Sequence, residues 1–338
     1  MRKPFAKLVC SLTLALSLCA ACWPQAATQT STTDWDELSG HFNYFSGGAL
    51  NIREFDVEMR DKMLVIEIVY SGDNDDHVPA YIVMPHGTGP FPAIIWGHWT
   101  QPGSKLANRD EFLDEAVALA HSGVMSLLID APMVRPGFKT ESMDEDPWRA
   151  AAQFSDAERQ QIVDLRRGVD VLLTRRYIDK TRIAYVGHSF GAHAGAILAG
   201  VEKRITSFVL MAGTYSDEED VRKATDKDSG AYKWREALGP HKVDMYFQDY
   251  AWDDPANFLS HTDGKSIFLQ FANKDVVTHE LANKYLGAFA AKDKKMEFYD
   301  SGHALNSAAR LDRDRWLQQR LRFKNLDEKA LGEIRQLR

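Results

Sequence analysis

A serine between two glycines carries the strongest chemical signal in this sequence. It lies in Gly187-His188-Ser189-Phe190-Gly191, directly after an apolar run and directly before a run of small residues. In a G-x-S-x-G pattern of this kind the chain turns sharply from a strand into a helix, and the glycines let the two elements approach closely. The turn projects the serine hydroxyl at the start of the helix, where backbone N–H groups can stabilise an oxyanion. The pattern therefore predicts that Ser189 is a nucleophile.

A serine hydroxyl is a weak nucleophile, so catalysis requires a histidine base and a carboxylate that orients the histidine. Where the serine lies on a strand-to-helix turn, the three residues follow in the chain order Ser, Asp, His. Asp275 comes shortly after the apolar run 266–271, and His303 comes shortly after the run 296–299. Both runs are predicted strands whose carboxyl ends meet the edge of the sheet that holds Ser189. Ser189, Asp275 and His303 form the predicted catalytic triad.

The chain offers a second position for the acid. Asp217 and Glu218 follow an earlier apolar run, 205–211, whose carboxyl end meets the same edge of the sheet. Either carboxylate is therefore an alternative to Asp275 as the partner of His303.

Two backbone N–H groups are expected to bind the oxyanion. The residue after the nucleophile, Phe190, supplies one, and the loop after an early strand supplies the other. That loop reads Trp96-Gly97-His98-Trp99, with a tryptophan where a histidine usually precedes the glycine. The N–H of His98 is the first candidate for the second donor, and the N–H of Trp99 is the next.

These residues require a sheet to position them, and the rest of the sequence provides its elements. Apolar runs predict buried strands, amphipathic stretches predict helices, and two β-rich runs around a polar turn predict a hairpin. The expected strands cover 63–70, 80–84, 92–96, 124–129, 182–186, 205–211, 266–271 and 296–299, and the expected helices cover 110–121, 156–176 and 190–200. Strands that alternate with helices form βαβ units. The predicted fold class is α/β, with a mostly parallel central sheet and helices on both faces.

The segment 212–262 is too long for a bare loop between two strands. Its aromatic residues include Tyr246, Phe247, Tyr250 and Trp252. We interpret it as a cap inserted into a single domain that spans residues 28–338, with a decorated crossover as the alternative. A cap that holds these rings over Ser189 would bury an apolar acyl or aryl group and limit the size of the substrate.

Residues 1–27 are typical of a secretory signal peptide, because cationic residues precede an uncharged and mostly apolar stretch, 8–22. A retained membrane anchor is the alternative, but this stretch is shorter than the ~20 residues that cross a bilayer. The context of Cys22 is similar to a bacterial lipoprotein box, with Cys19 where leucine is usual. We expect an exported protein, periplasmic or secreted, that is either a soluble product or a membrane-anchored lipoprotein with a lipid on Cys22.

Composition excludes several other functions. All three cysteines, Cys10, Cys19 and Cys22, lie in the leader, so the mature domain has no thiol nucleophile and no disulfide. The 41 basic and 48 acidic residues give a net charge of −7 without a basic stripe, so nucleic acid is not an expected partner.

Spacing disfavours a dinucleotide site and a metal site. Gly187, Gly191 and Gly195 are four residues apart, which does not match G-x-G-x-x-G. His188 and His193 are five residues apart, which is about 140° around a helix and unsuited to one metal ion.

With these features the sequence resembles the α/β-hydrolase superfamily, most closely its dienelactone-hydrolase and acetyl-xylan-esterase-like branch. Besides the three triad positions, the resemblance rests on the stretches 78–85, 89–93 and 164–177, and it covers roughly residues 63–305. It implies hydrolysis of a small-molecule carboxylic ester through an acyl-enzyme, with no cofactor. A serine nucleophile in place of cysteine argues against dienelactone hydrolysis itself.

Three functions remain open at this point. The first is a serine esterase that uses the triad. The second is a serine peptidase or acyltransferase, because the same triad serves amine leaving groups and acceptors other than water. The third is a binding protein that keeps the fold without turnover.

Overall fold

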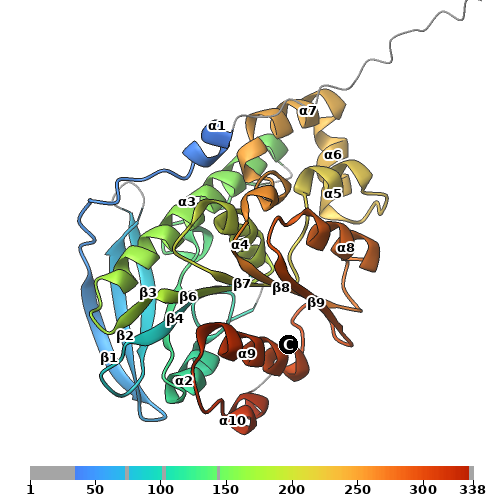
Figure 1. Ribbon diagram of the computed structural model, residues 1–338. Coiled ribbons are helices and arrows are strands. Elements are labelled where there is room, and N and C mark those ends of the chain that lie inside the picture. Colours follow the sequence, from blue (N-terminus) through green and yellow to red (C-terminus); the bar gives the residue numbers. More distant parts are fainter. Residues whose placement is uncertain (1–34, 73–75, 101–103, 143–144, 335–338) are drawn as a thin grey trace, which may run out of the picture. The chain divides into compact units, whose positions relative to one another are not determined.

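A nine-stranded sheet is the core of the described residues (Figure 1). The computed structural model describes residues 35–72, 76–100, 104–142 and 145–334, so the predicted leader and Cys22 lie outside them. Across the sheet the strand order is β1-β2-β3-β5-β4-β6-β7-β8-β9. The strands are β1 Arg53–Arg60, β2 Met63–Ser71, β3 His77–Met84, β4 Phe91–Gly97, β5 Met125–Ile129, β6 Ile178–His188, β7 Ser207–Met211, β8 Ser266–Ala272 and β9 Asp293–Tyr299.

The sheet is parallel from β5 to β9 and antiparallel at its other end. β4 pairs in parallel with β5 and β6, and the parallel pairing continues through β7 and β8 to β9. β1, β2 and β3 pair antiparallel to one another, and β3 pairs antiparallel to β5. The mostly parallel sheet and the hairpin are therefore confirmed. β1 is an additional edge strand with no buried residue, so no apolar run marks it in the sequence.

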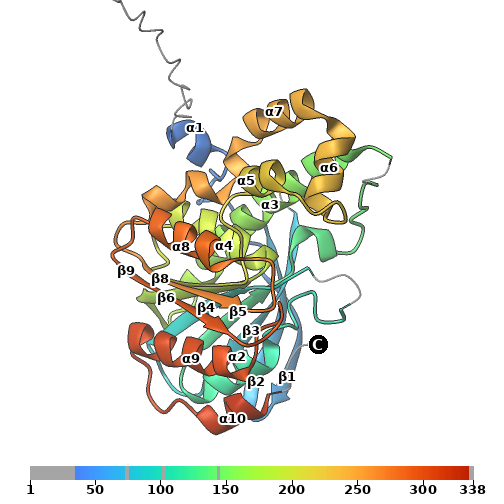
Figure 2. The ribbon, with the colours of Figure 1, turned by 90° about the vertical axis from the view of Figure 1, so that its right-hand side faces the viewer.

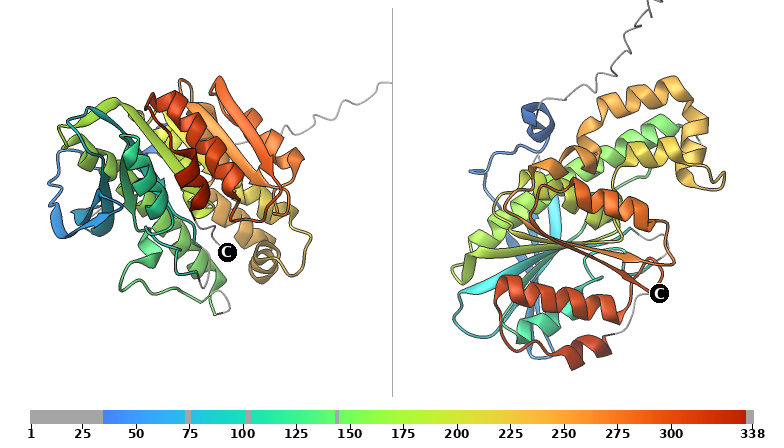
Figure 3. Two further views of the ribbon diagram at one scale, coloured as in Figure 1. Left: turned by 90° about the horizontal axis from the view of Figure 1, so that it is seen from below. Right: turned by 45° about the vertical axis from the view of Figure 1, so that its right-hand side comes forward.

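Helices cover both faces of the sheet (Figures 2 and 3). On one face α3, α4 and α8 contribute to one apolar core, and on the other face α2, α9 and α10 contribute to a second. The helices on the two faces are α2 Leu113–His121, α3 Pro147–Leu173, α4 Phe190–Val201, α8 His279–Ala288, α9 Ser307–Leu321 and α10 Glu328–Glu333. Of the helices that the structure describes, none is both long enough and apolar enough to cross a membrane.

Helix α3 begins nine residues before its predicted start. Pro147 occupies the first turn, and the Asp146 carboxylate accepts a hydrogen bond from the Arg149 N–H at 3.0 Å. Proline is favoured in a first turn and aspartate is a strong N-cap, so these residues fix the start of the helix. The predicted start at 156 was wrong because the amphipathic pattern was read without this cap.

The segment 212–262 folds into short helices that pack against the first half of α3. These are α5 Asp217–Lys223, α6 Gly230–Leu238 and α7 Pro240–Asp249, followed by three 3-10 turns between Ala251 and His261. Trp234 donates a hydrogen bond from Nε1 to the Pro147 carbonyl at 3.0 Å, and the Tyr246 ring packs edge-on against Trp234 at 4.9 Å. The extra turns of α3 therefore provide the surface on which this segment is seated.

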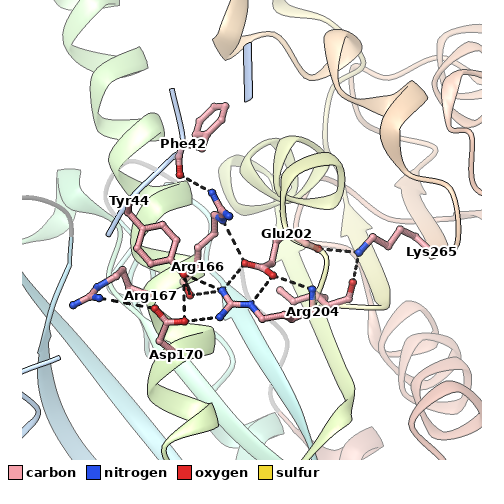
Figure 4. Close-up of polar contacts among 9 residues, drawn as sticks. Phe42, Tyr44, Arg166, Arg167, Asp170, Glu202, Arg204 and Lys265 are labelled. Atoms are coloured by element: carbon pink, nitrogen blue, oxygen red, sulfur yellow. Dashed lines mark hydrogen bonds and ion pairs between the residues drawn. The ribbon is translucent and has the colours of Figure 1, made fainter. Parts of the chain in front are cut away.

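A buried polar network joins α3 to the end of α4 (Figure 4). The Glu202 carboxylate lies directly after α4 and accepts hydrogen bonds from the Arg204 guanidinium at 2.6 and 2.8 Å and from Arg166 at 3.3 Å. Arg204 also pairs with Asp170 at 2.5 Å. Burial alone would raise the pKa of Glu202, but the hydrogen bonds from Arg204 and the charges of both arginines outweigh it and hold the pKa below its usual value.

This network makes Glu202→Gln a test of the fold. Removal of one charge from a buried network leaves the arginines less compensated, so we expect a loss of about 2–4 kcal/mol in the free energy of unfolding at pH 7.5. The pKa of Glu202 is lower in the folded state, so its contribution is present above the unfolded pKa of about 4.3 and declines as the pH falls further. Urea unfolding should show the deficit narrowing below about pH 4.

The matched control is Glu58→Gln, which removes a carboxylate from an exposed ion pair on β1. Exposed pairs contribute about 0–1 kcal/mol, so this variant should unfold close to the wild type. Equal stability of the two variants at pH 7.5 would contradict the structural role of Glu202.

Candidate active site

Ser189 lies on a strained turn between β6 and α4. Its backbone has φ 53° and ψ −112°, a conformation that costs energy for any residue other than glycine. The Ser189 N–H donates to the Met211 carbonyl of β7 at 2.8 Å, which holds the strained residue against the end of the next strand. The local geometry is the one that the G-x-S-x-G pattern predicted.

The turn depends on the close approach of three backbone segments. A Cβ on Gly187 would overlap the Gly191 carbonyl, and a Cβ on Gly191 would overlap the carbonyl of Gly97 at the end of β4. Gly97 also pairs with Gly187 in the parallel ladder. The glycines therefore bring the β4 loop, which carries His98, beside the serine.

Asp275 and His303 are in direct contact. His303 lies in the loop after β9 and Asp275 in the loop after β8. The Nδ1 atom of His303 lies 2.7 Å from Oδ2 of Asp275. Burial alone would raise the pKa of Asp275, but hydrogen bonds from His303 and from the Val276 N–H outweigh it and lower the pKa. The carboxylate is therefore charged at neutral pH and fixes Nδ1 of His303 as the protonated nitrogen, so that Nε2 is available as a base.

The alternative acids lie elsewhere. Oδ2 of Asp217 lies 3.1 Å from Nε2 of His193 on α4, and Nδ1 of His193 lies 2.5 Å from the buried Glu158. Glu218 pairs with Arg222 at 2.8 Å. Of the three acids considered from the sequence, Asp275 is the one that the structure brings to His303.

A buried histidine that sequence reasoning did not use holds the loop of His303. His188 is fully buried, with Nδ1 2.5 Å from Oε1 of Glu111 and Nε2 2.9 Å from the His303 carbonyl. Burial alone would lower the pKa of His188. The charge and hydrogen bond of Glu111, together with the His303 carbonyl, outweigh burial, so the pKa of His188 is raised. Both ring nitrogens face acceptors, so an imidazolium that donates twice satisfies this site. Nothing in the spacing of Glu111 marks it as the partner of His188.

The two candidate oxyanion donors in the β4 loop differ in what they contact. The Trp99 N–H donates to Oε2 of Glu111 at 2.6 Å, so it is engaged. The His98 ring is buried, accepts from the Ala131 N–H at 2.9 Å and donates from Nδ1 to the Trp99 carbonyl at 2.6 Å. Burial lowers the pKa of His98, in keeping with a neutral ring that braces the loop. Phe190 lies in the first turn of α4, where helices leave N–H groups without intrahelical acceptors.

No family model matches the chain, and no curated protein matches it. Solved structures are similar to it. Acetyl xylan esterase from Paenibacillus sp. R4 superposes with a TM-score of 0.66 and 16% identity over 85% of this chain and 93% of that one. Acetyl xylan esterase 1 from Thermoanaerobacterium sp. JW/SL YS485 gives 0.67 and 16% over the same shares. The 2,6-dihydroxy-pseudo-oxynicotine hydrolase gives 0.54 and 18% over 82% and 69%.

The chain has the α/β-hydrolase fold. In this fold the reacting groups lie at the carboxyl ends of the parallel strands, and the nucleophile follows the strand that here is β6. Ser189 directly follows β6, and Asp275 and His303 lie in the loops that follow β8 and β9 in this sheet. Within the described part of the chain, no group of three or more His, Cys, Asp and Glu side chains is arranged to hold a metal ion.

A cavity of about 1180 Å³ lies between the 212–262 segment, the start of α3 and the loops before it. The ring of Phe154 lines the cavity and packs edge-on against Phe190, the residue after the nucleophile, at 5.5 Å, whereas Ser189 itself is not among the cavity residues. Aromatic side chains from α3, from the loop before it and from the 212–262 segment form much of the wall: Phe138, Phe154, Trp234, Tyr246, Phe247 and Tyr250.

One predicted cap residue lies outside this wall. Trp252 packs against Phe42 at 6.2 Å and stacks on His41 at 5.1 Å, so it anchors the N-terminal segment and is not among the cavity residues. The prediction that Trp252 covers Ser189 was therefore wrong. The sequence showed that 212–262 is rich in aromatic residues but not which of them face inward.

The packing around the turn at Ser189 predicts that alanine substitutions at two glycines differ in their effect on stability. In Gly187→Ala the new methyl group meets backbone of the same turn, which cannot move aside, so we expect a loss of more than about 3 kcal/mol in the free energy of unfolding. Gly302, next to His303, has open space around it and an ordinary φ, so Gly302→Ala should stay within about 1 kcal/mol of the wild type. Urea unfolding measures both, and wild-type stability of Gly187→Ala would show that the backbones are farther apart than described.

Proposed function

We propose that this protein is an exported serine hydrolase that cleaves small carboxylic esters with Ser189, His303 and Asp275. The observation that carries the proposal is the 2.7 Å contact between Asp275 and His303 at the sheet edge that also holds the strained Ser189. The similar structures named as acetyl xylan esterases support ester hydrolysis. The leader sequence supports export, and mass spectrometry of the mature N-terminus separates a soluble product from a lipid on Cys22.

The proposed mechanism has two steps, acylation and deacylation of Ser189. Ser189 Oγ attacks the ester carbonyl while Nε2 of His303 takes its proton, and the tetrahedral oxyanion is held by the N–H groups of Phe190 and His98. His303 then returns the proton to the departing alcohol, which leaves an acyl group on Ser189. In the second half, His303 takes a proton from a water molecule, which attacks the acyl group on Ser189. His303 then returns the proton to Ser189 Oγ as the acid leaves, which restores the free serine. Asp275 stabilises the imidazolium that forms in each half and keeps Nδ1 protonated.

The nucleophile is tested by Ser189→Ala. The variant should fold like the wild type and lose about 10³-fold or more of kcat on p-nitrophenyl acetate, because the acyl-enzyme cannot form. An organophosphonate should add its mass to wild-type Ser189 and leave the variant unlabelled. Retained kcat in Ser189→Ala would overturn the assignment, and turnover of aminoacyl anilides in preference to esters would make the protein a peptidase.

The acid is tested by a pair of matched variants, Asp275→Asn and Asp217→Asn. Asparagine at 275 can turn its NH₂ toward Nδ1 and favour the wrong tautomer of His303, so kcat on p-nitrophenyl acetate should fall by about 10³ to 10⁴. Asp217 contacts His193 and not His303, so the same change there should cost less than about 10-fold. The opposite ranking would move the acid to the end of β7.

A further inference from the structure

Glu111 and His188 connect two loops of the candidate active site. Glu111 is only 7% exposed, and its two carboxylate oxygens contact different groups. Oε2 accepts from the Trp99 N–H of the β4 loop at 2.6 Å, and Oε1 lies 2.5 Å from Nδ1 of His188. The other ring nitrogen of His188, Nε2, lies 2.9 Å from the His303 carbonyl. A chain of hydrogen bonds therefore runs from the β4 loop to the main chain of His303.

The Trp99 ring packs against both histidines of this chain. It stacks on His188 with the ring centres 5.0 Å apart and on His303 with the ring centres 6.4 Å apart. Trp99 Nε1 also donates to the Leu106 carbonyl at 3.2 Å, which fixes the indole in the β4 loop. A change at His188 would therefore disturb the packing of the His303 ring as well as the hydrogen bond to its main chain.

The two hydrogen bonds of His188 require a charged ring. A neutral imidazole has a single N–H, and both ring nitrogens of His188 face oxygens that only accept when Glu111 is ionised. One neutral tautomer would direct a lone pair at the Glu111 carboxylate, and the other would direct a lone pair at the His303 carbonyl. Only an imidazolium donates to both, so deprotonation of His188 must break one end of the chain.

The charges on α2 and α9 do not replace Glu111 as the counter-charge of His188. Those nearest to His188, some of them across a small cavity of about 20 Å³, belong to Glu115, Arg310, Arg313 and Asp314. Arg313 pairs with Glu115 at 2.6 Å and with Asp314 at 2.8 Å, and Glu115 also pairs with Arg310. Two positive charges thus meet two negative ones. Burial and Arg313 act to lower the pKa of His188, and Glu111 outweighs them.

The positive charge of His188 also acts on the proposed acid. Against the effect of burial, hydrogen bonds from His303 and from the Val276 N–H lower the pKa of Asp275, and the charge of His188 lowers it further. An ionised Asp275 keeps Nδ1 of His303 protonated. The imidazolium of His188 therefore favours the same tautomer of His303 that Asp275 selects.

We propose that Glu111 and the imidazolium of His188 are positioning residues for catalysis at Ser189. The pair fixes the β4 loop, which carries the proposed oxyanion donor His98, relative to the main chain of His303. Both residues act through other groups and not on the substrate itself. Misplaced reacting groups slow the chemical step more than they weaken binding, so loss of the pair should lower kcat and leave KM nearly unchanged. This role rests on the proposed ester hydrolysis.

His188→Gln tests the bridge between the loops. Glutamine has one NH₂ group where the imidazolium has two diverging N–H groups, so either Glu111 or the His303 carbonyl loses its donor. At pH 7.5 we expect kcat on p-nitrophenyl acetate to fall by ~10²-fold, with KM within ~3-fold of the wild type.

Glu202→Gln is the matched control, because it removes a charge from a buried network after the far end of α4. At a temperature where both variants are folded, its kcat should stay within ~2-fold of the wild type. An equal loss of kcat in the two variants would show that lower stability explains the effect and would overturn the positioning role. If His188→Gln fails to fold, the variant of Glu111 described next decides the question.

Glu111→Gln separates the charge from the hydrogen bonds. Its amide oxygen can accept from the Trp99 N–H while its NH₂ donates to Nδ1, so a neutral His188 that donates from Nε2 satisfies every group. The pKa of His188 is raised, so in the wild type the imidazolium persists below that pKa and is lost as the pH rises through it. Wild-type kcat should therefore fall ~10-fold or more between about pH 7 and pH 10.

In Glu111→Gln, kcat at pH 7.5 should fall no more than ~5-fold, and the alkaline decline should be absent. The rate is followed in a pH-stat with ethyl acetate, and circular dichroism checks that both proteins stay folded over the range. A flat wild-type profile, or the same decline in both proteins, would overturn the requirement for a charged His188. A role in stability alone would not remove the decline selectively in this variant.

NMR of ¹⁵N-labelled histidine reads the charge of His188 without turnover. In folded Ser189→Ala at pH 7.5 both ring nitrogens of His188 should be protonated, whereas adding Glu111→Gln should leave one protonated. His188→Gln assigns the signals. A neutral His188 in Ser189→Ala would overturn the proposal whether or not the protein hydrolyses esters. A charged His188 in a wild type that hydrolyses no ester would refute the esterase and, with it, the catalytic role of the pair.

Discussion

The close approach of three backbone segments at Gly97, Gly187 and Gly191 is the constraint on which the site depends. β4 and β6 are neighbours in the sheet, and α4 starts at the end of β6. A side chain at Gly187 or Gly191 would overlap backbone of the neighbouring element, and one at Gly97 would overlap the Tyr185 hydroxyl. The contact forces Ser189 into a conformation that an L-residue avoids, and it brings the β4 loop beside the serine. The strain is sustained because the surrounding sheet and helix are buried and cannot relax.

Glu111 connects the loops that follow this contact. One of its oxygens accepts from the Trp99 N–H of the β4 loop, and the other accepts from His188, which donates in turn to the His303 carbonyl. A single buried carboxylate thus ties the ends of β4, β6 and β9 together, and its charge and hydrogen bond raise the pKa of His188, which favours the imidazolium form. The position of the His303 main chain depends on this pair, whereas the orientation of its ring depends on Asp275.

The sequence predicted the parts of the molecule that local patterns encode. The apolar runs located eight of the nine strands in the described residues. The positions of Asp275 and His303 shortly after their strands identified the pair that the structure shows in contact. Contacts between residues far apart in the sequence were missed. The residues around Glu111 give no sign that it contacts a histidine 77 residues away. The early start of α3 was missed for the opposite reason, because a capping signal was present at Asp146 but the amphipathic period was given more weight.

The same early turns of α3 explain why the cavity could not be predicted. Trp234, Val243 and Tyr246 of the 212–262 segment form a small apolar cluster. Trp234 and Tyr246 also hydrogen-bond to the turns of α3 between Pro147 and Ser155. The aspartates of the segment are thereby brought to an apolar surface, where they are less stable as anions than in water. The turns of α3 before residue 156, which the sequence did not predict, are therefore what place these carboxyl groups in the cavity wall.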